Sequence, residues 1–328
     1  PSIPNIPSTF HRVARAYFFC YNGPAMIYIA NDSADPAYNL ALEEFAFSEL
    51  SEDVLLLWIS APSVVCGKFQ NPYREVDVLG AARRGIPVLR RESGGGAVYH
   101  DPGNINYSFI RPAAPALDYD RQLSPVIRAL NALGIPAERR GASEIAAFGK
   151  KVSGSAQRQS KGRELAHGTL LFDSDLEALH ELTSRPDEQR TRSKGVKSQP
   201  SEVRNMRPLL PRDMGARQFL EALRGELLRG GETVRLNPEQ DARVRETARE
   251  KYESWAWNFG RSPEFTRESE RPPVSYAAKN GVITAFSLGG RPVDAFVGAR
   301  LEVSEIEAVC RSIADSPADA EMLLSAIF

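Results

Sequence analysis

Short apolar runs alternate with segments of helical periodicity along most of the chain. The apolar runs are rich in β-branched or aromatic residues and end at turn residues, which is typical of strands: residues 54–59, 63–67, 86–89, 97–99, 105–110 and 168–172. Another strand is expected around residues 26–29. Strands and helices follow one another irregularly, so the pattern predicts a mixed sheet rather than a strict βαβ winding.

The helical pattern is clearest over residues 36–50, with Asp35 as the N-cap and Pro36 at the first helical position. Apolar residues recur there at helical spacing and predict an apolar face made of Tyr38, Leu42, Phe45, Ala46 and Leu50. Further helices are predicted over residues 121–133, 175–184 and 213–229, the last capped by Asp213.

A connector rich in Gly, Asn and Pro lies at residues 229–241. After it we expect a helix to about Trp257, a turn, a strand around residues 282–287 and two short terminal helices. The remaining ~85 residues are enough for a small accessory domain. The sequence therefore predicts an N-terminal extension at residues 1–25, a main domain at 26–235 and a C-terminal domain at 242–328.

Charge and composition exclude two classes of function. The 328 residues include 41 Lys and Arg against 42 Asp and Glu, whereas general nucleic-acid binders carry a strongly basic footprint. The longest charge-free stretches, residues 16–31 and 54–67, contain turn residues and are shorter than the ~20 apolar residues of a membrane span. We expect neither a nucleic acid nor a membrane as partner.

Cysteine and histidine usage favours a reducing compartment. The three cysteines, Cys20, Cys66 and Cys310, are far apart and odd in number, and the four histidines lack zinc-site spacing. Residues 1–25 contain Arg and Ser but no acidic residue, which is typical of a transit peptide, although a dispensable extension explains them more simply. We expect a cytoplasmic protein, with a mitochondrial location as the weaker alternative.

The most informative segment is residues 90–109, RRESGGGAVYHDPGNINYSF. Successive glycines let the backbone approach a ligand closely, and their N–H groups can converge on an anion. Arg91 adds a planar cation suited to phosphate. The segment is neither a dinucleotide fingerprint nor a P-loop. A Gly-lined hairpin with a structural role is the alternative, and His100 with Asp101 is expected to serve a structural turn.

A second segment, residues 149–158, reads GKKVSGSAQR. A Lys that enters a Ser/Gly-rich strand or turn can neutralise a phosphate and polarise a carboxyl group. A solvated pair of lysines at a hairpin tip is the alternative.

Together and in this order, the two segments resemble the lipoate–protein ligase family. That family's pattern RRxSGGGxVxHDxGNxNxSF is met by residues 90–109, and its K-V/I-SG-SAxR element by residues 151–158. Further matches include residues 39–44, 167–171 and 194–205. The resemblance implies an α+β fold: a mixed, largely antiparallel sheet flanked by helices, as in biotin and lipoyl ligases and class II synthetases, with a small α+β C-terminal domain.

The resemblance implies an acid–amine ligase that works in two steps. Lipoate and ATP give lipoyl-AMP and pyrophosphate, and a lysine of an apo lipoyl domain then takes the lipoyl group and releases AMP. The implied cofactors are ATP and Mg²⁺, with lipoate as the substrate. The implied acceptors are E2 subunits of 2-oxoacid dehydrogenase complexes and the glycine cleavage H protein.

The resemblance also implies roles for individual residues. Lys151 would be catalytic, contacting both the α-phosphate and the lipoyl carbonyl, and His167 would help to bind lipoate. Glu144 stands where many members have Asp and is the candidate Mg²⁺ contact, with a solvated carboxylate as the alternative. The wall that binds ATP and lipoyl-AMP would comprise Arg91, Ser93, Gly94, Gly95, Gly96, Ala97, Val98 and Tyr99, together with Lys151.

One region departs from the family pattern and some functions stay open. Gln199 and Pro200 stand where basic residues are common, within a locally basic stretch at residues 185–217. That stretch is either a loop that closes over the adenylate, a surface that attracts acidic lipoyl domains, or a solvated Arg-rich loop.

The alternative functions are a transferase that uses preformed lipoyl-AMP, an octanoyl transferase and a non-catalytic lipoate-binding module. An acyl-enzyme transferase needs a cysteine nucleophile, and none lies between Cys66 and Cys310. Biotin ligase is disfavoured because its GRGRxGR-like loop is absent.

Overall fold

The computed structural model describes residues 26–183, 190–199 and 201–328. The predicted extension at residues 1–25, with Cys20, lies outside the described residues, as do Ser184, Arg185 and Pro200. Within the described residues, the largest sheet has eight strands in the spatial order β12 (Thr233–Val234), β1 (Ile27–Ile29), β2 (Val54–Ile59), β6 (Asn104–Pro112), β10 (Arg163–Leu171), β9 (Lys150–Ser160), β8 (Glu144–Ala147) and β7 (Ala137–Arg140).

This large sheet is mixed and largely antiparallel, as expected. Strand β1 pairs in parallel with β12 and β2, and the neighbours from β2 to β7 pair antiparallel. Alternate residues of β6 face opposite sides of the sheet. Tyr107 and Phe109 enter one hydrophobic core, while Asn106 and Ser108 face the other side, where a cavity lies.

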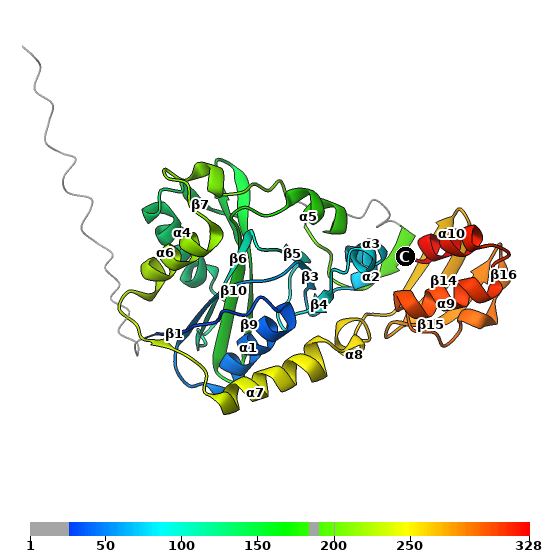
Figure 1. Cartoon of the computed structure of the whole chain (residues 1–328), viewed down its shortest axis with the longest axis horizontal. Helices are drawn as coiled ribbons and strands as arrows, with labels where there is room; N and C mark the ends of the chain where they lie inside the picture. Colours follow the sequence, from blue (N-terminus) through cyan, green and yellow to red (C-terminus); the bar gives the residue numbers. More distant parts are fainter. Residues whose placement is uncertain (1–25, 184–189, 200) are drawn as a thin grey trace, which may run out of the picture.

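Helices cover both faces of the large sheet (Figure 1). Helices α4 (Tyr119–Ala132) and α6 (Ala216–Leu228) pack on one face, and α6 is followed by the edge strand β12. On the other face lie α1 (Pro36–Glu49), α7 (Pro238–Thr247), a π-helical turn (Ala248–Tyr252) and α8 (Trp255–Asn258). The predicted single helix up to Trp257 is therefore interrupted before α8.

Helix α1 begins as predicted but is more buried than its apolar pattern indicates. The Asp35 carboxylate accepts a hydrogen bond from the backbone N–H of Ala37 at 2.9 Å, which caps the helix. The polar residues Asn39 and Glu43 are 1% and 3% exposed. They are buried because α1 is enclosed between the sheet on one side and α7 with the π-helical turn on the other.

The predicted start of helix α6 is wrong. The N-cap is Gly215, whose backbone N–H donates to the side chain of Gln218 at 3.0 Å. Asp213 lies before the helix, and its carboxylate accepts from Arg207 Nε at 2.9 Å. The Asp213 carboxylate therefore pairs with the Arg207 guanidinium and does not cap the helix.

Two smaller sheets lie beside the main one. One places β3 (Ser63–Cys66) between β4 (Val88–Arg90) and β5 (Val98–His100), next to α2 (Pro72–Glu75), α3 (Val78–Arg83) and α5 (Leu176–Thr183). The other has the order β11 (Thr191–Ser193), β13 (Phe265–Glu270), β14 (Pro273–Lys279), β15 (Val282–Leu288) and β16 (Arg291–Pro292), and packs with α9 (Val303–Ile313) and α10 (Pro317–Ile327). Short 3₁₀ turns occupy Arg207–Leu209 and Asp294–Phe296.

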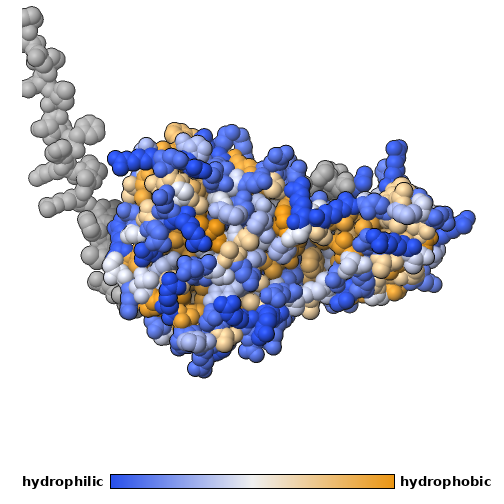
Figure 2. All heavy atoms as spheres, viewed as in Figure 1, coloured by the Kyte–Doolittle hydropathy of each residue, from blue (hydrophilic) through white to orange (hydrophobic). Residues whose placement is uncertain are grey.

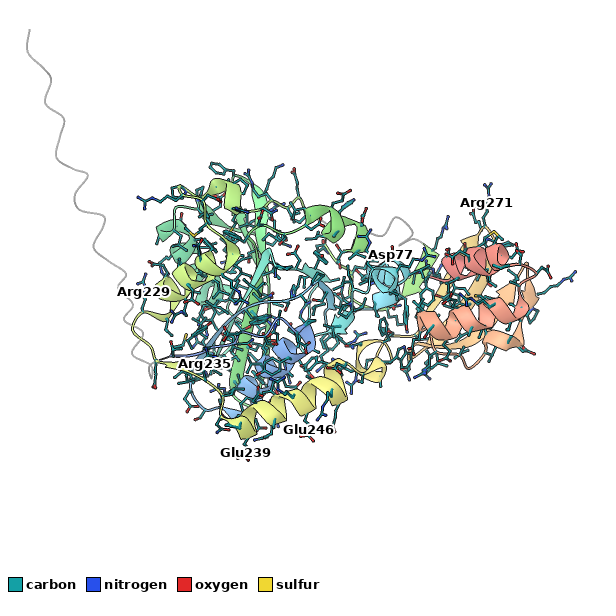
Figure 3. All side chains as sticks on the ribbon, in the orientation of Figure 1. Asp77, Arg229, Arg235, Glu239, Glu246 and Arg271 are labelled. Carbon is teal, nitrogen blue, oxygen red and sulfur yellow. The ribbon has the colours of Figure 1, made fainter. Side chains whose placement is uncertain are left out.

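The surface is mostly polar. The face seen in Figure 2 is largely hydrophilic, with apolar atoms showing between charged side chains. The outer side of α7 carries the exposed residues Glu239 and Glu246 (Figure 3), while its Val244 is buried against α1. In the part of the chain that the structure describes, no helix combines the length and apolar character needed to cross a membrane.

Arg90, in β4, joins the C-terminal part of the chain to the three-stranded sheet. Its fully buried guanidinium donates through Nη2 to the carbonyl oxygen of Asn258 at 2.8 Å. Through Nη1 it donates to the carbonyl oxygens of Gln70 at 2.8 Å and Lys68 at 3.0 Å. The Trp257 indole N–H donates back to the Arg90 carbonyl oxygen at 2.7 Å. One side chain thus connects segments that are far apart in sequence.

Replacing Arg90 with Lys keeps the charge but removes the planar fork. Because buried carbonyl oxygens then lose their donors, we expect Arg90→Lys to lower the free energy of unfolding by about 2–4 kcal/mol. Urea denaturation measures this. The matched control is Arg84→Lys, at an exposed ion pair with Glu181, for which we expect a change within about 0.5 kcal/mol. Equal effects at the two positions would contradict the anchoring role.

Candidate active site

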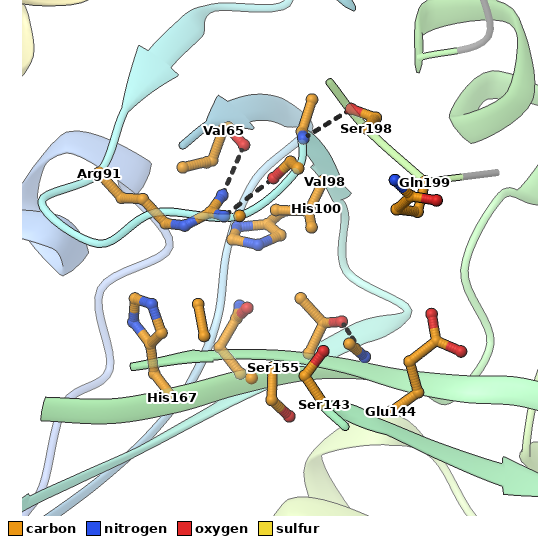
Figure 4. Close-up of a pocket in the computed structure, with 18 of the residues that line it drawn as sticks. Val65, Arg91, Val98, His100, Ser143, Glu144, Ser155, His167, Ser198 and Gln199 are labelled. Carbon is orange, nitrogen blue, oxygen red and sulfur yellow. Dashed lines mark hydrogen bonds between the residues drawn. The ribbon is translucent and has the colours of Figure 1, made fainter. Parts of the chain in front are cut away.

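A cavity of about 360 Å³ lies between the large sheet and the glycine-rich segment (Figure 4). Its floor is the sheet, from which strands β2, β6, β9 and β10 contribute side chains: Trp58, Asn106, Ala156, His167 and Thr169. Its roof comprises Arg91, Gly95, Gly96, Ala97, Val98, His100 and residues 196–199. The two segments singled out in the sequence therefore form opposite walls of one cavity.

Arg91 holds the shape of the glycine-rich segment. Its Nη2 donates to the carbonyl oxygens of Gly94 and Gly96 at 2.6 and 2.9 Å, and its Nη1 donates to that of Val65 at 3.0 Å. Burial lowers the pKa of Arg91 to about 10, so the guanidinium stays charged at neutral pH. Its contacts are with the protein itself, and a direct contact with a nucleotide stays a prediction.

Two glycines in this region are required by geometry. Gly95 has φ of 88°, in the left-handed region that favours glycine. Gly67 lies against it: a Cβ at Gly67 would be 2.2 Å from the carbonyl oxygen of Gly95. A side chain at either position would move the cavity roof.

His167 is held by hydrogen bonds at both ring nitrogens. Its Nδ1 lies 2.8 Å from Oε1 of Glu43, which can only accept when ionised, so Nδ1 carries the proton. Its Nε2 lies 2.6 Å from the hydroxyl of Ser93, which accepts from Arg91 Nε and therefore has its own proton to donate to a neutral ring. Ser108 also donates to Glu43, at 2.5 Å. His167 lines the cavity, as predicted for a lipoate-binding residue, but both nitrogens are engaged.

A β-bulge turns Lys151 toward the cavity. Across β8 and β9, Glu144 pairs with Gly154, whereas Ala146 pairs with Lys151, which leaves Val152 as the extra residue. In a regular strand, Lys151 would point away from the face that carries Gly154, because side chains alternate. The bulge places Lys151 on that face.

The candidate catalytic lysine forms an ion pair with the candidate metal ligand. Lys151 Nζ lies 2.8 Å from Glu144 Oε1, and both side chains are 22% exposed and line the cavity. On the other side, the Lys151 N–H donates to the carbonyl oxygen of Glu202, and the Arg204 N–H donates to that of Lys151, each at 2.9 Å. The structure thus brings Glu144, Lys151 and the glycine-rich segment together.

Ser198 is a site residue that the sequence did not indicate. Its hydroxyl accepts from the backbone N–H of Ala97 at 3.2 Å and from Gln70 Nε2 at 3.0 Å. Its own N–H donates to Glu75 Oε2 at 2.9 Å. Residues 196–199 are thereby fixed over the cavity, in the region where the sequence departs from the family pattern. No local motif signals this contact, because its partners are more than a hundred residues away.

Glu92 connects the two motif segments through charge. Its carboxylate lies 2.5 Å from Lys251 Nζ, 2.8 Å from Lys68 Nζ and 3.2 Å from Arg158 Nη1. Burial acts to raise the pKa of Glu92, but the hydrogen bonds from Lys251 and Lys68 outweigh it and lower the pKa to about 2. The end of β9, the π-helical turn and the glycine-rich segment therefore meet at one carboxylate.

Other proteins are similar to this chain in sequence. The family model described as "Lipoyl protein ligase A/B catalytic domain" matches residues 35–228. The chain is 37% identical over 261 residues to lipoate-protein ligase LplJ of Bacillus subtilis, covering 76% of this chain and 78% of that one. The chain belongs to the lipoyl protein ligase A/B family.

Solved structures of related proteins share the fold. A lipoate-protein ligase A described as bound with ATP is 25% identical, with a TM-score of 0.60 over 71% of this chain and 98% of that chain. A bi-partite lipoate protein ligase from Thermoplasma acidophilum, described together with its E2 lipoyl domain, has a TM-score of 0.61 at 24% identity and covers 71% of this chain and 95% of that chain. The α+β fold expected from the sequence is confirmed.

The cysteines that the structure describes in this chain are not placed to act as an acyl-enzyme nucleophile. Cys66 is fully buried in β3, and burial raises the pKa of its thiol to about 11. Cys310 in α9 is likewise buried, with its pKa raised to about 11. Among the residues that the structure describes, no cysteine lines the cavity. Among the described residues, the acyl-cysteine chemistry of the octanoyl transferase alternative therefore has no nucleophile in the cavity lining.

The site fits a metal that arrives with a nucleotide better than a resident metal. Over the described ranges, no group of three or more His, Cys, Asp or Glu is arranged to hold a metal ion. Mg²⁺ usually binds to one or two carboxylates together with substrate phosphates. Glu144 is the carboxylate in the lining of the first cavity. The site therefore matches a Mg²⁺ that is bound by one protein carboxylate together with substrate phosphates.

The charge on Glu92 predicts a specific loss of stability in acid. Its pKa of about 2 in the folded state lies below the ordinary 4.5, so its stabilisation is complete above about pH 4.5 and disappears toward pH 2. We expect Glu92→Gln to lower the free energy of unfolding by about 1–3 kcal/mol at pH 7. Urea denaturation from pH 7 to pH 3 should show the two proteins converging. A constant difference would contradict the charge-based role.

Proposed function

We propose that the chain is an ATP-dependent lipoate–protein ligase that forms lipoyl-AMP and transfers the lipoyl group to a lysine of an apo lipoyl domain. The observation that carries the proposal is the place of Lys151 at the junction of two cavities. A second cavity, of about 910 Å³, adjoins the first. The residues common to both linings are Ala97, Val98, Lys151, Gly154, Thr169, Ser198 and Gln199.

The two cavities suit the two small substrates. The first has an apolar end formed by Leu40, Trp58 and Val65, which fits an acyl chain. The second, lined in part by Tyr99 and Leu176, is large enough for a nucleotide. A carboxylate entering from the first cavity and an α-phosphate entering from the second would meet at Lys151.

The chemistry requires a fixed cation at that junction. In the first step a lipoate carboxylate oxygen attacks the α-phosphorus and pyrophosphate leaves. In the second, the lysine amine attacks the acyl carbon, loses a proton and displaces AMP. Negative charge develops at the junction in both steps, on the phosphate in the first and on the acyl oxygen and the departing AMP in the second, and Lys151 beside the backbone of Gly96–Tyr99 would stabilise it. Arg91 and Ser93 support this wall from behind through their contacts with each other and with the glycines.

Glu144 has two roles in this proposal. Without nucleotide it neutralises Lys151 across 2.8 Å. When phosphates take over the contact with Lys151, the carboxylate becomes available to Mg²⁺, which would shield the phosphate charge. Arg140, whose Nε lies 3.6 Å from Glu144 Oε2, would remain its second neighbour.

The acceptors in this proposal are lipoyl domains of E2 subunits and the glycine cleavage H protein, in the cytoplasm. The relative from Thermoplasma acidophilum, described with its E2 lipoyl domain, supports the first of these.

Lys151→Ala tests the assignment of the catalytic lysine. We expect it to fold normally and to lose about 100- to 1000-fold in lipoate-dependent ATP–pyrophosphate exchange, because a preorganised cation is removed. The matched control is the neighbouring Lys150→Ala, whose ammonium pairs with the exposed Glu202. Exchange by Lys151→Ala at the rate of Lys150→Ala would refute the role of Lys151.

The function itself is tested with an apo lipoyl domain, lipoate, ATP and Mg²⁺. We expect the mass of the domain to increase by one lipoyl group only when ATP is present. Modification that requires supplied lipoyl-AMP would indicate the transferase instead. Lipoate binding without any modification would indicate the binding module.

A further inference from the structure

Two exposed apolar side chains lie next to each other beside the first cavity. Phe69 is 59% exposed and Val196 is 47% exposed, although a long stretch of sequence separates them. The backbone N–H of Val196 donates to the carbonyl oxygen of Phe69 at 3.1 Å, which brings the two residues together. Val196 also lines the cavity, whereas Phe69 does not. A residue that is both half exposed and part of the lining lies at the cavity mouth, so the pair continues from the mouth onto the outer surface.

Buried contacts hold this pair in a fixed position. Arg74 is 2% exposed and donates through Nη2 to the carbonyl oxygen of Gly195 at 2.8 Å and through Nη1 to that of Ser193 at 3.0 Å. A Cβ at Gly195 would lie 3.2 Å from the carbonyl oxygen of Phe69, so the two segments are in close contact. Scattered exposed apolar residues need no explanation. A pair on a fixed backbone differs, because it loses little further freedom when another surface covers it.

Positive charge surrounds the apolar pair. Residues 190–199 read RTRSKGVKSQ and contain four cations and no acidic residue. Lys194 and Lys197 are exposed on either side of Val196 in the sequence. An apolar centre with a polar rim is typical of a protein–protein interface, and a cationic rim favours an acidic partner. We call the following four residues the rim patch: Phe69, Val196, Lys194 and Lys197.

The second reaction step shows which partner would cover the rim patch. The acceptor lysine has to reach Lys151 from outside, so the protein that carries it has to lie on the surface around the cavity mouth. We propose that the acceptor domain docks on the rim patch, with an apolar contact on Phe69 and acidic groups opposite the two lysines. The inference rests on the proposed function and adds to it the surface that recognises the acceptor. It assigns the basic residues 190–199 to attraction of that domain.

The test separates docking from chemistry by three assays on the full chain. ATP–pyrophosphate exchange with lipoate reports the first step. Hydroxylamine replaces the acceptor in the second assay: its nitrogen attacks the acyl carbon, loses a proton and displaces AMP, and it needs no docking surface. The third assay measures KM for an apo lipoyl domain of an E2 subunit. Phe69 lies outside the linings of both cavities, so its substitution leaves the two small-molecule assays intact.

We expect Phe69→Ala to raise the KM for the lipoyl domain about 5- to 30-fold, because a buried aromatic anchor carries much of the energy of an interface. The matched control is Phe148→Ala, in the turn between β8 and β9, where the ring is 68% exposed. It should keep the wild-type KM.

Charge reversal tests the rim. Lys194→Glu should raise the KM for the lipoyl domain and weaken its dependence on salt, because one of the attracting charges is lost. Lys279→Glu, at an exposed lysine of β14, should change neither.

Several results would overturn the inference. They are an unchanged KM for the lipoyl domain in Phe69→Ala, a larger increase in Phe148→Ala, and an equal loss of Phe69→Ala activity with hydroxylamine. Binding of the wild type to anionic phospholipid vesicles that is lost in Lys194→Glu, with the KM for the domain unchanged, would assign the rim patch to a membrane instead. Failure of the wild type in the exchange assay would overturn the proposed function itself.

Discussion

Two adjacent buried guanidinium groups hold the glycine-rich segment in place, and the site depends on them. Arg90 and Arg91 direct their side chains to different partners: Arg90 to backbone oxygens around Asn258 and Gln70, Arg91 to those of Val65, Gly94 and Gly96. A buried cation is tolerated only when its donors are satisfied. Burying the two charges requires backbone carbonyl oxygens as hydrogen-bond acceptors. These carbonyl groups are held in fixed positions, and they set the shape of the cavity roof.

Charged side chains in and beside the site also form ion pairs with one another when no substrate is bound. Lys151 forms an ion pair with Glu144, and Glu92 forms ion pairs with Lys68, Lys251 and Arg158. A nucleotide would enter a place where one cation is already held by an exchangeable carboxylate. The near-zero net charge of the whole chain does not reveal this local organisation, because a sum over all residues contains no information on which charges are paired.

The sequence was sufficient for the fold class and for the two motif segments, because these depend on local patterns. It did not reveal the bulge that leaves Val152 unpaired, since a bulge breaks the alternation from which side-chain direction is inferred. It assigned Arg91 to phosphate, a contact that stays a prediction, but it did not indicate the hydrogen bonds of Arg91 to Val65, Gly94 and Gly96, and it missed Ser198. The bulge belongs to the strand register, and Ser198 and the Val65 partner of Arg91 are distant in sequence from the groups they bind, so local patterns do not contain them.

Arg90 also has a consequence for the order in which the protein is made. Its partner Asn258 follows it by 168 residues, so Arg90 leaves the ribosome long before its acceptor carbonyl has been synthesised. In the same way, strand β11 cannot pair until its partner β13 has been synthesised. Contacts of such long sequence separation form late and slow the folding of the chain. A nascent chain therefore contains all the residues of the cavity roof well before that roof can take its final shape.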